Sequence, residues 1–135
     1  MANGWYENAI ESFARKGIDW VTDPIKAYPV GPGYVPNLVT DTFVNAIGAN
    51  LLGAGVLIDN RVVLDGGILD GDDLVFSDVP GGAALAAVVV AVDKGIATTS
   101  PLLLYFDTGA NFPMTATGGP ISVQWDTGAN RIARL

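Results

Sequence analysis

Two copies of the pentapeptide Asp-Thr-Gly-Ala-Asn carry the most obvious candidate chemistry in this sequence. The first copy occupies residues 107–111 after the apolar run "LLLYF", and the second occupies residues 126–130 after "ISVQW". Asp-Thr-Gly is the motif that holds the catalytic carboxylates of aspartic proteases, in which two aspartates share one proton. The repeat therefore raises the question of whether Asp107 and Asp126 form a catalytic pair.

The surroundings of the two motifs favour a structural role instead. A retroviral-type protease carries this loop early in its domain, whereas only 26 residues follow Gly109 here, and the 18 residues between Asp107 and Asp126 are too few for two pseudo-symmetric lobes. An apolar strand followed by Asp-Thr-Gly is typical of a hairpin turn with glycine in the left-handed conformation. We therefore predict one turn at Asp107 and Gly109. A second turn, at Asp126 and Gly128, joins "ISVQW" to "RIARL" in a sheet that the C-terminal strand closes.

The acidic stretch from residue 65 to residue 78 is the second candidate site. Five aspartates lie in it, and clustered carboxylates with backbone carbonyls are the ligands that calcium prefers. The EF-hand spacing and its terminal glutamate are missing. We interpret the stretch as turn-forming residues on a solvated edge, with a weak calcium site at Asp70, Asp72 and Asp73 as the alternative.

Two residue types on which many active sites depend are missing from the chain. Because cysteine is absent, disulfides, thiolate metal sites and cysteine nucleophiles are excluded. Because histidine is absent, the most frequent general base and the usual ligand of transition metals are excluded as well. The sequence therefore predicts a protein that is not an enzyme, with no catalytic residue, no cofactor and no small-molecule substrate.

The charge distribution limits the partners that we expect. The formal net charge is −7, and the seven lysines and arginines are scattered along the chain. A nucleic acid or an anionic membrane would require a clustered basic face, so neither is an expected partner. The longest apolar run, "AALAAVVVAV" at 83–92, is too short to cross a bilayer and reads as a buried strand, and the first residues do not resemble a secretory signal. We expect a soluble protein made in a cytoplasm.

The elements that must position these residues are mainly strands. Apolar residues at helical spacing between Trp5 and Lys16 predict one short helix, so we divide the chain into an N-terminal helix or arm at 1–17 and a single β domain at 18–135. Pro29 predicts an edge strand within 18–30, and a helical turn is expected near 40–48. Further short strands are predicted at 55–58, 61–64, 74–77, 85–93, 101–107, 121–125 and 131–135. Their spacing is typical of an antiparallel β-sandwich or barrel, jelly-roll-like in outline.

The composition also suggests that part of the surface is covered by other chains. Half of the residues are hydrophobic and only 16% are charged, which leaves few charges for the surface of a small monomer. Aromatic side chains are frequent anchors of protein interfaces, although exposed aromatic rings would also suit a carbohydrate-binding module for host-surface glycans. The residues that we expect at an interface are Trp5, Tyr6, Ile10, Phe13, Tyr28 and Tyr34.

Several stretches in order along the chain resemble a group of short structural proteins encoded by tailed bacteriophages. These are "IDWVTDPIKAYPV", "YVPNLVTDTF", "DGGILDGDDLVF", "GIATTSPLLLYFDTG" and "FPMTATGGPISVQWDTGANRI". The resemblance covers nearly the whole chain and is most specific between "TSPLLLYFDTG" and "WDTGANRI". The sequence departs from it at "NLLGAGVLI", which is richer in glycine and apolar residues than the polar segment that the resemblance implies there.

The resemblance implies a virion component without catalytic residues. A capsid decoration or cement protein on the outer capsid surface fits best, made in the cytoplasm of the host bacterium and bridging capsid subunits to stabilise the head. Its expected partners are further copies of itself, as a homo-oligomer, and the major capsid protein. A tail or neck accessory structural protein is the alternative within this class.

Overall fold

The computed structural model describes residues 4–77, 79–107, 113–125 and 132–134. They form mainly antiparallel strands with one α-helix, which confirms the predicted fold class. Helix α1 spans Glu7–Ala14, and two 3-10 turns, η1 and η2, span Val44–Ala46 and Gly48–Asn50. The strands are β1 (Gly4–Trp5), β2 (Ile25–Val30), β3 (Val56–Leu57), β4 (Val62–Leu64), β5 (Ile68–Asp70), β6 (Leu74–Phe76), β7 (Ala84–Leu85), β8 (Ala87–Val92), β9 (Leu102–Phe106), β10 (Met114–Thr115), β11 (Ile121–Val123) and β12 (Ala133–Arg134).

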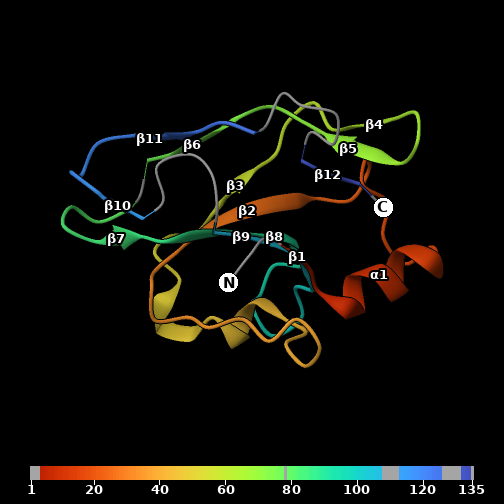
Figure 1. The fold of residues 1–135 in the computed structure, drawn as a ribbon, viewed down its shortest axis with the longest axis horizontal. Helices are drawn as coiled ribbons and strands as arrows, with labels where there is room; N and C mark the ends of the chain where they lie inside the picture. The colour runs from red at the N-terminus through yellow and green to blue at the C-terminus, as the bar shows by residue number, and fades with distance from the viewer. Residues whose placement is uncertain (1–3, 78, 108–112, 126–131, 135) are drawn as a thin grey trace.

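A five-stranded antiparallel sheet in the order β1-β9-β8-β2-β3 forms the centre of the molecule. The other strands form three small sheets, in the orders β12-β5-β4, β11-β6 and β10-β7. Figure 1 shows β4, β5, β6, β11 and β12 on one side of the central sheet, and the segment with η1 and η2 on the other. The arrangement is sandwich-like. Among the described residues no sheet closes on itself, so the barrel alternative is wrong.

Strand β8 explains why the central sheet is covered on both faces. All six of its residues are buried, as the apolar run at 83–92 predicted. Successive side chains of a strand point to opposite faces. Val88, Val90 and Val92 therefore enter the core shared with the second layer of strands, whereas Ala87, Val89 and Ala91 enter a separate core beneath the η1–η2 segment.

The N-terminal residues belong to the central sheet. Strand β1 pairs with β9, with Gly4 opposite Tyr105 and Trp5 opposite Leu104. Helix α1 then starts at Glu7, and Ala9 is buried on the chain's own core. The helix begins later than predicted because Trp5 belongs to strand β1.

The strand that contains Pro29 is not the edge of its sheet, contrary to the prediction. Strand β2 lies between β8 and β3, although β3 reaches only Lys26 and Ala27. Beside Pro29 the neighbour is a loop, since the Leu52 N–H donates to the Pro29 carbonyl at 2.9 Å. Within a strand, the N and C=O of one residue point the same way, so the missing N–H of Pro29 faces this loop and no hydrogen bond to β8 is lost.

The strands that flank the two pentapeptides do not form the predicted hairpins. Strand β9 pairs with β1 and β8, whereas β10, the next strand, pairs with β7. Strand β11 pairs with β6, and the C-terminal strand β12 pairs with β5 instead of closing the sheet against β11. Each pentapeptide therefore connects two different sheets.

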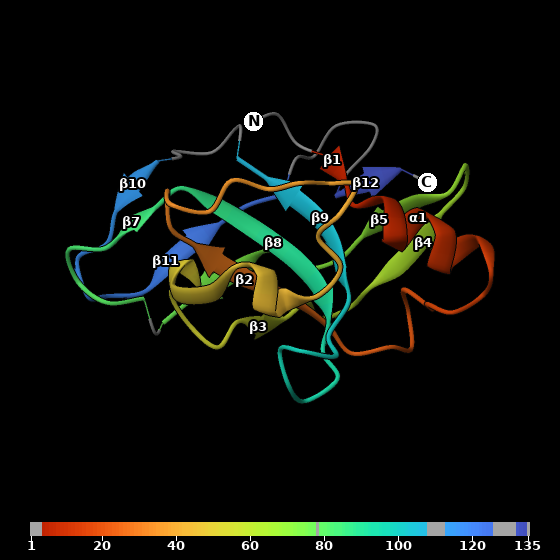
Figure 2. The same ribbon diagram turned by 90° about the horizontal axis from the view of Figure 1, so that it is seen from below.

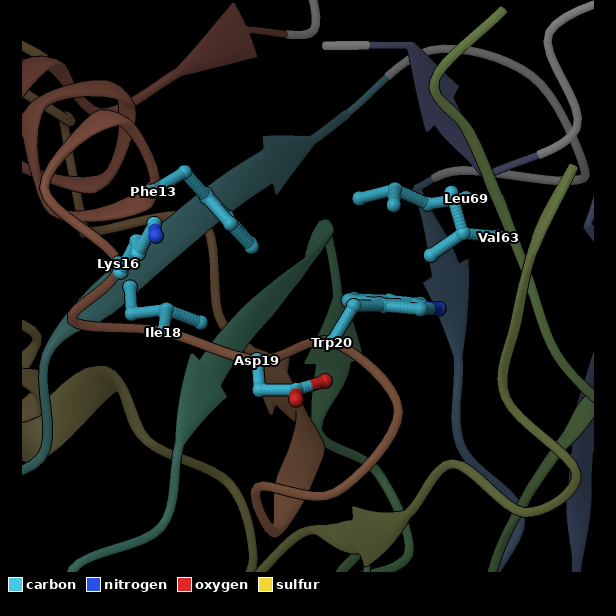
Figure 3. A pocket seen from close by; sticks show the side chains of 7 residues that line it. All are labelled: Phe13, Lys16, Ile18, Asp19, Trp20, Val63 and Leu69. Atoms are coloured by element: carbon cyan, nitrogen blue, oxygen red, sulfur yellow. The ribbon is translucent and has the colours of Figure 1, made fainter. Parts of the chain in front are cut away.

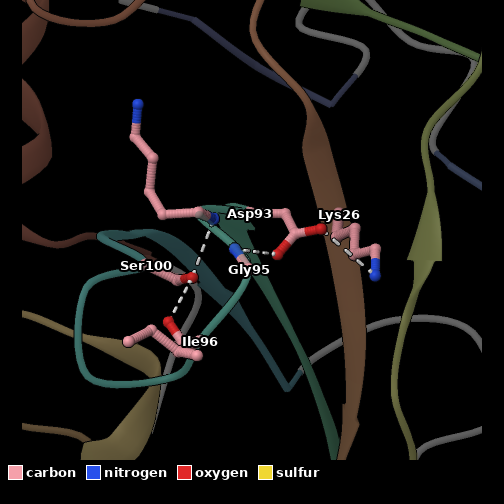
Figure 4. A network of polar contacts seen from close by, with 6 residues as sticks. Lys26, Asp93, Gly95, Ile96 and Ser100 are labelled. Carbon is pink, nitrogen blue, oxygen red and sulfur yellow. Dashed lines mark hydrogen bonds and ion pairs between the residues drawn. The ribbon is translucent and has the colours of Figure 1, made fainter.

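A polar network closes the loop between β8 and β9 (Figure 4). The buried Ser100 hydroxyl accepts from the Lys94 N–H at 2.9 Å and donates to the Ile96 carbonyl at 2.8 Å. The Asp93 carboxylate accepts from the Gly95 N–H at 3.0 Å and lies 3.3 Å from the Lys26 ammonium. The hydrogen bond from Gly95 and the nearby Lys26 hold the pKa of Asp93 below its ordinary value. Strands β2, β8 and β9 are thus tied together at this end.

Candidate functional site

Residues of α1, of the loop that follows it and of the β4–β5 hairpin line a groove. Figures 1 and 2 show α1, β4 and β5 at the same end of the molecule. Its volume is about 360 Å³, and most of its lining is apolar. Figure 3 shows the indole ring of Trp20 between Ile18 on one side and Val63 and Leu69 on the other. The lining residues are Phe13, Lys16, Ile18, Asp19, Trp20, Val63 and Leu69.

The Arg61 side chain positions the wall of the groove. Its guanidinium donates to the carbonyls of Trp20 at 2.7 Å, Val21 at 3.1 Å and Asp23 at 2.5 Å, and to Ile58 of its own segment. The loop that follows α1 is therefore fixed to the start of β4. The Trp20 indole adds a second link, because its Nε1–H donates to the Asp70 carbonyl of β5 at 3.1 Å.

Strand β4 extends this apolar region to the surface. Val62, Val63 and Leu64 are all exposed, by 43, 50 and 38%. Ile10, one helical turn before Phe13 on α1, is 51% exposed. We call the set Ile10, Phe13, Val62, Val63 and Leu64 the α1–β4 surface. Val63 is exposed at the groove, which Phe13 also lines while partly buried. Because successive side chains of a strand point to opposite faces, Val62 and Leu64 are exposed on the other face of β4.

Few polar side chains line the groove. Lys16 and Asp19 are its two charged lining residues. The Asp19 carboxylate accepts the N–H groups of Val21 and Thr22, and these hydrogen bonds lower its pKa, so it is a weak base. The groove is thus lined mainly by apolar side chains, with one weakly basic carboxylate among them.

Three of the predicted interface residues are buried in the core of the chain itself. Tyr6, Tyr28 and Tyr34 are buried in the core beneath the η1–η2 segment. The hydroxyls of Tyr6 and Tyr34 are 2.7 Å apart, and Tyr34 donates to Asp41 Oδ2 at 2.8 Å. Because Tyr34 has a single hydroxyl proton, Tyr6 must donate to Tyr34. The hydrogen bonds of Tyr6 and Tyr34 connect the start of α1 to the 34–41 loop, and all three tyrosine side chains are buried within the chain.

The other predicted interface residues lie nearer the groove. Trp5 is partly buried, packs edge to face on Phe13 with ring centroids 5.7 Å apart, and donates its Nε1–H to the Arg134 carbonyl at 3.2 Å. Phe13 lines the groove, and Ile10 is exposed beside it. Two of the six predicted residues, Ile10 and Phe13, are thus part of the α1–β4 surface.

The three indoles do not form an exposed platform for a sugar. Trp20 is buried, and Trp5 and Trp125 are partly buried. Each Nε1–H is used within the chain, Trp125 donating to the Asp72 carbonyl at 2.9 Å as Trp5 and Trp20 donate to carbonyls of Arg134 and Asp70.

Two of the three candidate calcium ligands use their carboxylates in hydrogen bonds within the chain. Asp72 accepts from the Asn60 amide at 2.7 Å, and Asp73 accepts from the Trp125 N–H at 2.9 Å. Asp70 contributes its backbone carbonyl to Trp20. In the part of the chain that the structure describes, no three histidine, cysteine or acidic side chains gather as a metal site.

Of the four predicted turn residues, the structure describes only Asp107. Gly109, Asp126 and Gly128 lie outside the described residues. Asp107 follows β9 directly, next to Tyr105. Burial, followed by the Asp107 carboxylate, raises the pKa of Tyr105 to about 12.

The sequence did not predict two features of the site. In the sequence, Arg61 was only one of seven scattered cations. In the structure, its guanidinium fixes the loop after α1. The apolar triplet at 62–64, between Arg61 and Asp65, was expected as a strand but not as an exposed one. Its flanking charges and glycines were the available signal for a strand that leaves the core.

Comparison with known proteins returns no match among protein families and none among curated proteins. No helix within the described ranges has the length and apolar character needed to span a membrane.

Proposed function

We propose that this chain is a non-enzymatic structural protein that works by binding other proteins, as a capsid decoration or cement protein on the outer head of a tailed bacteriophage. The observation that carries the proposal is the α1–β4 surface, in which four apolar side chains are exposed and the fifth, Phe13, is partly buried at an apolar groove. The resemblance to short phage structural proteins supplies the biological setting. Copies of this chain and the major capsid protein are the partners.

Burial of apolar surface drives such an assembly. Each square ångström of apolar surface removed from water contributes roughly 25 cal/mol. The free-energy cost of the freedom lost on association is subtracted from the total for the interface. A cement protein multiplies this modest gain over many copies on one shell. The low charged fraction of 16% is consistent with a surface that is partly covered in the assembly, and the net charge of −7 suits the outside of a shell away from DNA.

The test is binding to capsids of the phage whose genome encodes the chain. Purified protein is added to capsids that lack it, and the amount that sediments with them is measured. We expect saturable binding with a fixed number of copies per capsid. Ile10→Lys should weaken the binding, because it places a charge on the α1–β4 surface, whereas Val35→Lys, at an exposed valine in the 31–43 loop, should not.

Two results would overturn the proposal. One is absence of the chain from purified virions by mass spectrometry. The other is a protein that ignores capsids at all concentrations and instead binds a glycan, which would favour the carbohydrate-binding alternative.

A further inference from the structure

Strand β4 is the outer strand of its sheet. In the order β12-β5-β4 it pairs with β5 on one side, and no strand among the described residues pairs with its other side. An open edge with exposed apolar side chains is a template for pairing with another chain, and many proteins protect such an edge with a charged residue. The three residues of β4 are Val, Val and Leu, with no charge inside the strand.

The backbone of Val63 faces the open edge. Val63 pairs with Leu69 of β5, and the Leu69 carbonyl accepts from Ile132 at 3.0 Å, on the β12 side. Because the N–H and C=O of one residue point to the same side of a strand, Leu69 directs both groups away from β4. Val63 and Leu69 are thus a non-hydrogen-bonded pair, and the N–H and C=O of Val63 point outward. No backbone group of the described residues pairs with them, so they can pair with a further strand.

The charges that flank β4 are complementary to each other about its centre. Arg61 lies two residues before Val63, and Asp65 lies two residues after it. The Arg61 guanidinium donates only to carbonyls, and among the described residues neither Arg61 nor Asp65 takes part in an ion pair. If a second β4 runs antiparallel with Val63 opposite Val63, Arg61 of each copy lies opposite Asp65 of the other.

From this juxtaposition we infer that two copies of the chain associate by antiparallel pairing of their β4 strands about a two-fold axis at Val63. The self-complementary order of charge, apolar triplet and opposite charge favours a second copy over an unrelated strand, since a two-fold axis requires the same patch on both sides. Val63 lines the groove, so the pairing places the Val63 side chains of both copies side by side at the groove wall. The inference deepens the proposed function by naming the surface of self-association.

The chain offers a matched control for this pairing. Val75 is 53% exposed and occupies the middle of the three-residue strand β6, as Val63 is 50% exposed in the middle of β4. The same substitution at the two positions changes charge and apolar area in the same way. Only the change at Val63 lies at the proposed two-fold axis.

The first experiment measures the mass of the full chain by sedimentation over a range of concentrations. We expect the wild-type chain to reach twice its 14.0 kDa mass. Val63→Lys, which sets two like charges opposite each other, should weaken dimerisation by at least about tenfold, and Val75→Lys should leave it unchanged. A wild-type chain that stays monomeric, or equal effects at both positions, overturns the inference.

The second experiment uses the absence of cysteine from the chain. Val63→Cys and Val75→Cys each carry one thiol, so a disulfide can form only between two chains. Opposite residues in a hydrogen-bonded antiparallel pair have Cα atoms about 5.5 Å apart, which is within the range that a disulfide spans. Under mild oxidation Val63→Cys should yield a cross-linked dimer much faster than Val75→Cys, and equal rates overturn the inference.

The two proposals fail separately. A chain that binds capsids but is monomeric and does not cross-link through position 63 overturns the β4 pairing alone. A chain that dimerises through β4 but does not bind capsids overturns the cement function alone.

Discussion

The phenyl ring of Phe106 packs edge to face on the indole of Trp125, with ring centroids 5.3 Å apart and planes inclined at 61°. Phe106 ends β9 in the central sheet, and Trp125 follows β11 in the second layer. Each residue directly precedes one copy of Asp-Thr-Gly-Ala-Asn. The residues that precede the two pentapeptides are therefore in contact with each other, and this contact links two layers of the fold.

Removing either ring should destabilise the protein. We expect Phe106→Ala and Trp125→Ala each to lower the free energy of unfolding by about 2–3 kcal/mol, at the low end for aromatic truncation because both rings are only partly buried. The double variant should lose about 1 kcal/mol less than the sum, because edge-to-face pairs couple by that amount. Urea unfolding of the four proteins measures the coupling, and strict additivity would contradict the contact.

Arg61 should be important for stability although it forms no ion pair with a described residue. Arg61→Ala leaves the carbonyls of Trp20, Ile58 and Asp23 without this donor, and we expect a loss of about 2–3 kcal/mol in unfolding free energy. Arg61→Lys should recover less than half of the loss, because an ammonium cannot reproduce the planar fork of donors.

The control for Arg61 is Arg15, which is exposed and pairs with Glu11 one turn away on the surface at 3.1 Å. Arg15→Ala should change the unfolding free energy by less than about 0.5 kcal/mol. Equal effects of the two alanine variants in thermal and urea unfolding would refute the role assigned to Arg61.

The hydroxyl chain from Tyr6 through Tyr34 to Asp41 should stabilise the 34–41 loop against the central sheet. Tyr6→Phe removes one hydrogen bond at little change in volume, and we expect a loss of about 1 kcal/mol. Asp41→Ala removes the acceptor of both Tyr34 and the Asn37 N–H, and it should cost about 2 kcal/mol or more. Hydrogen exchange should show faster opening of the loop in the Asp41 variant than in wild type, and unchanged exchange would argue against the chain.

All four tyrosines should resist ionisation in the folded protein. Burial raises the pKa of Tyr28 and Tyr105 to about 12, and it raises the pKa of Tyr6 and Tyr34 further, against an ordinary value of about 10. A raised phenol pKa adds stability that is complete below the unfolded value near 10 and is lost as the pH rises toward 12 and beyond. Ultraviolet titration should detect almost no tyrosinate at pH 10 in the native protein and about half ionisation in urea. Half ionisation at pH 10 without urea would disprove the burial of these residues.

Short-range features explain how much of the fold could be predicted. The run at 83–92 has enough valine and alanine to predict a buried strand without knowledge of its neighbours, and the apolar spacing around Ala9 and Phe13 predicts the helix. The partner of each strand could not be predicted in this way. The predicted hairpin between "ISVQW" and "RIARL" is wrong because β11 pairs with β6 and β12 with β5, across distances in sequence that no local pattern encodes.

The candidate site shows the same limit. Tyr6, Tyr28 and Tyr34 were predicted at an interface because aromatic residues are common there, but the sequence does not say that an internal layer beneath η1 and η2 would bury them. Val62, Val63 and Leu64 looked like any short strand. Their exposure and the open edge of β4, which among the described residues pairs with β5 alone, are properties of the tertiary structure.

The sequence by itself determined the mainly antiparallel β class, the single short helix, the buried central strand, and the absence of histidine and cysteine chemistry. These follow from composition and from the spacing of apolar residues, which act over a few positions. Only the tertiary structure decided which strands pair and that Arg61 holds the loop after α1. It also decided that the backbone N–H and C=O of Val63 point to the open edge of β4. The physical reason is that strand pairing and burial depend on contacts between residues far apart in the chain, and many pairings satisfy the same local pattern.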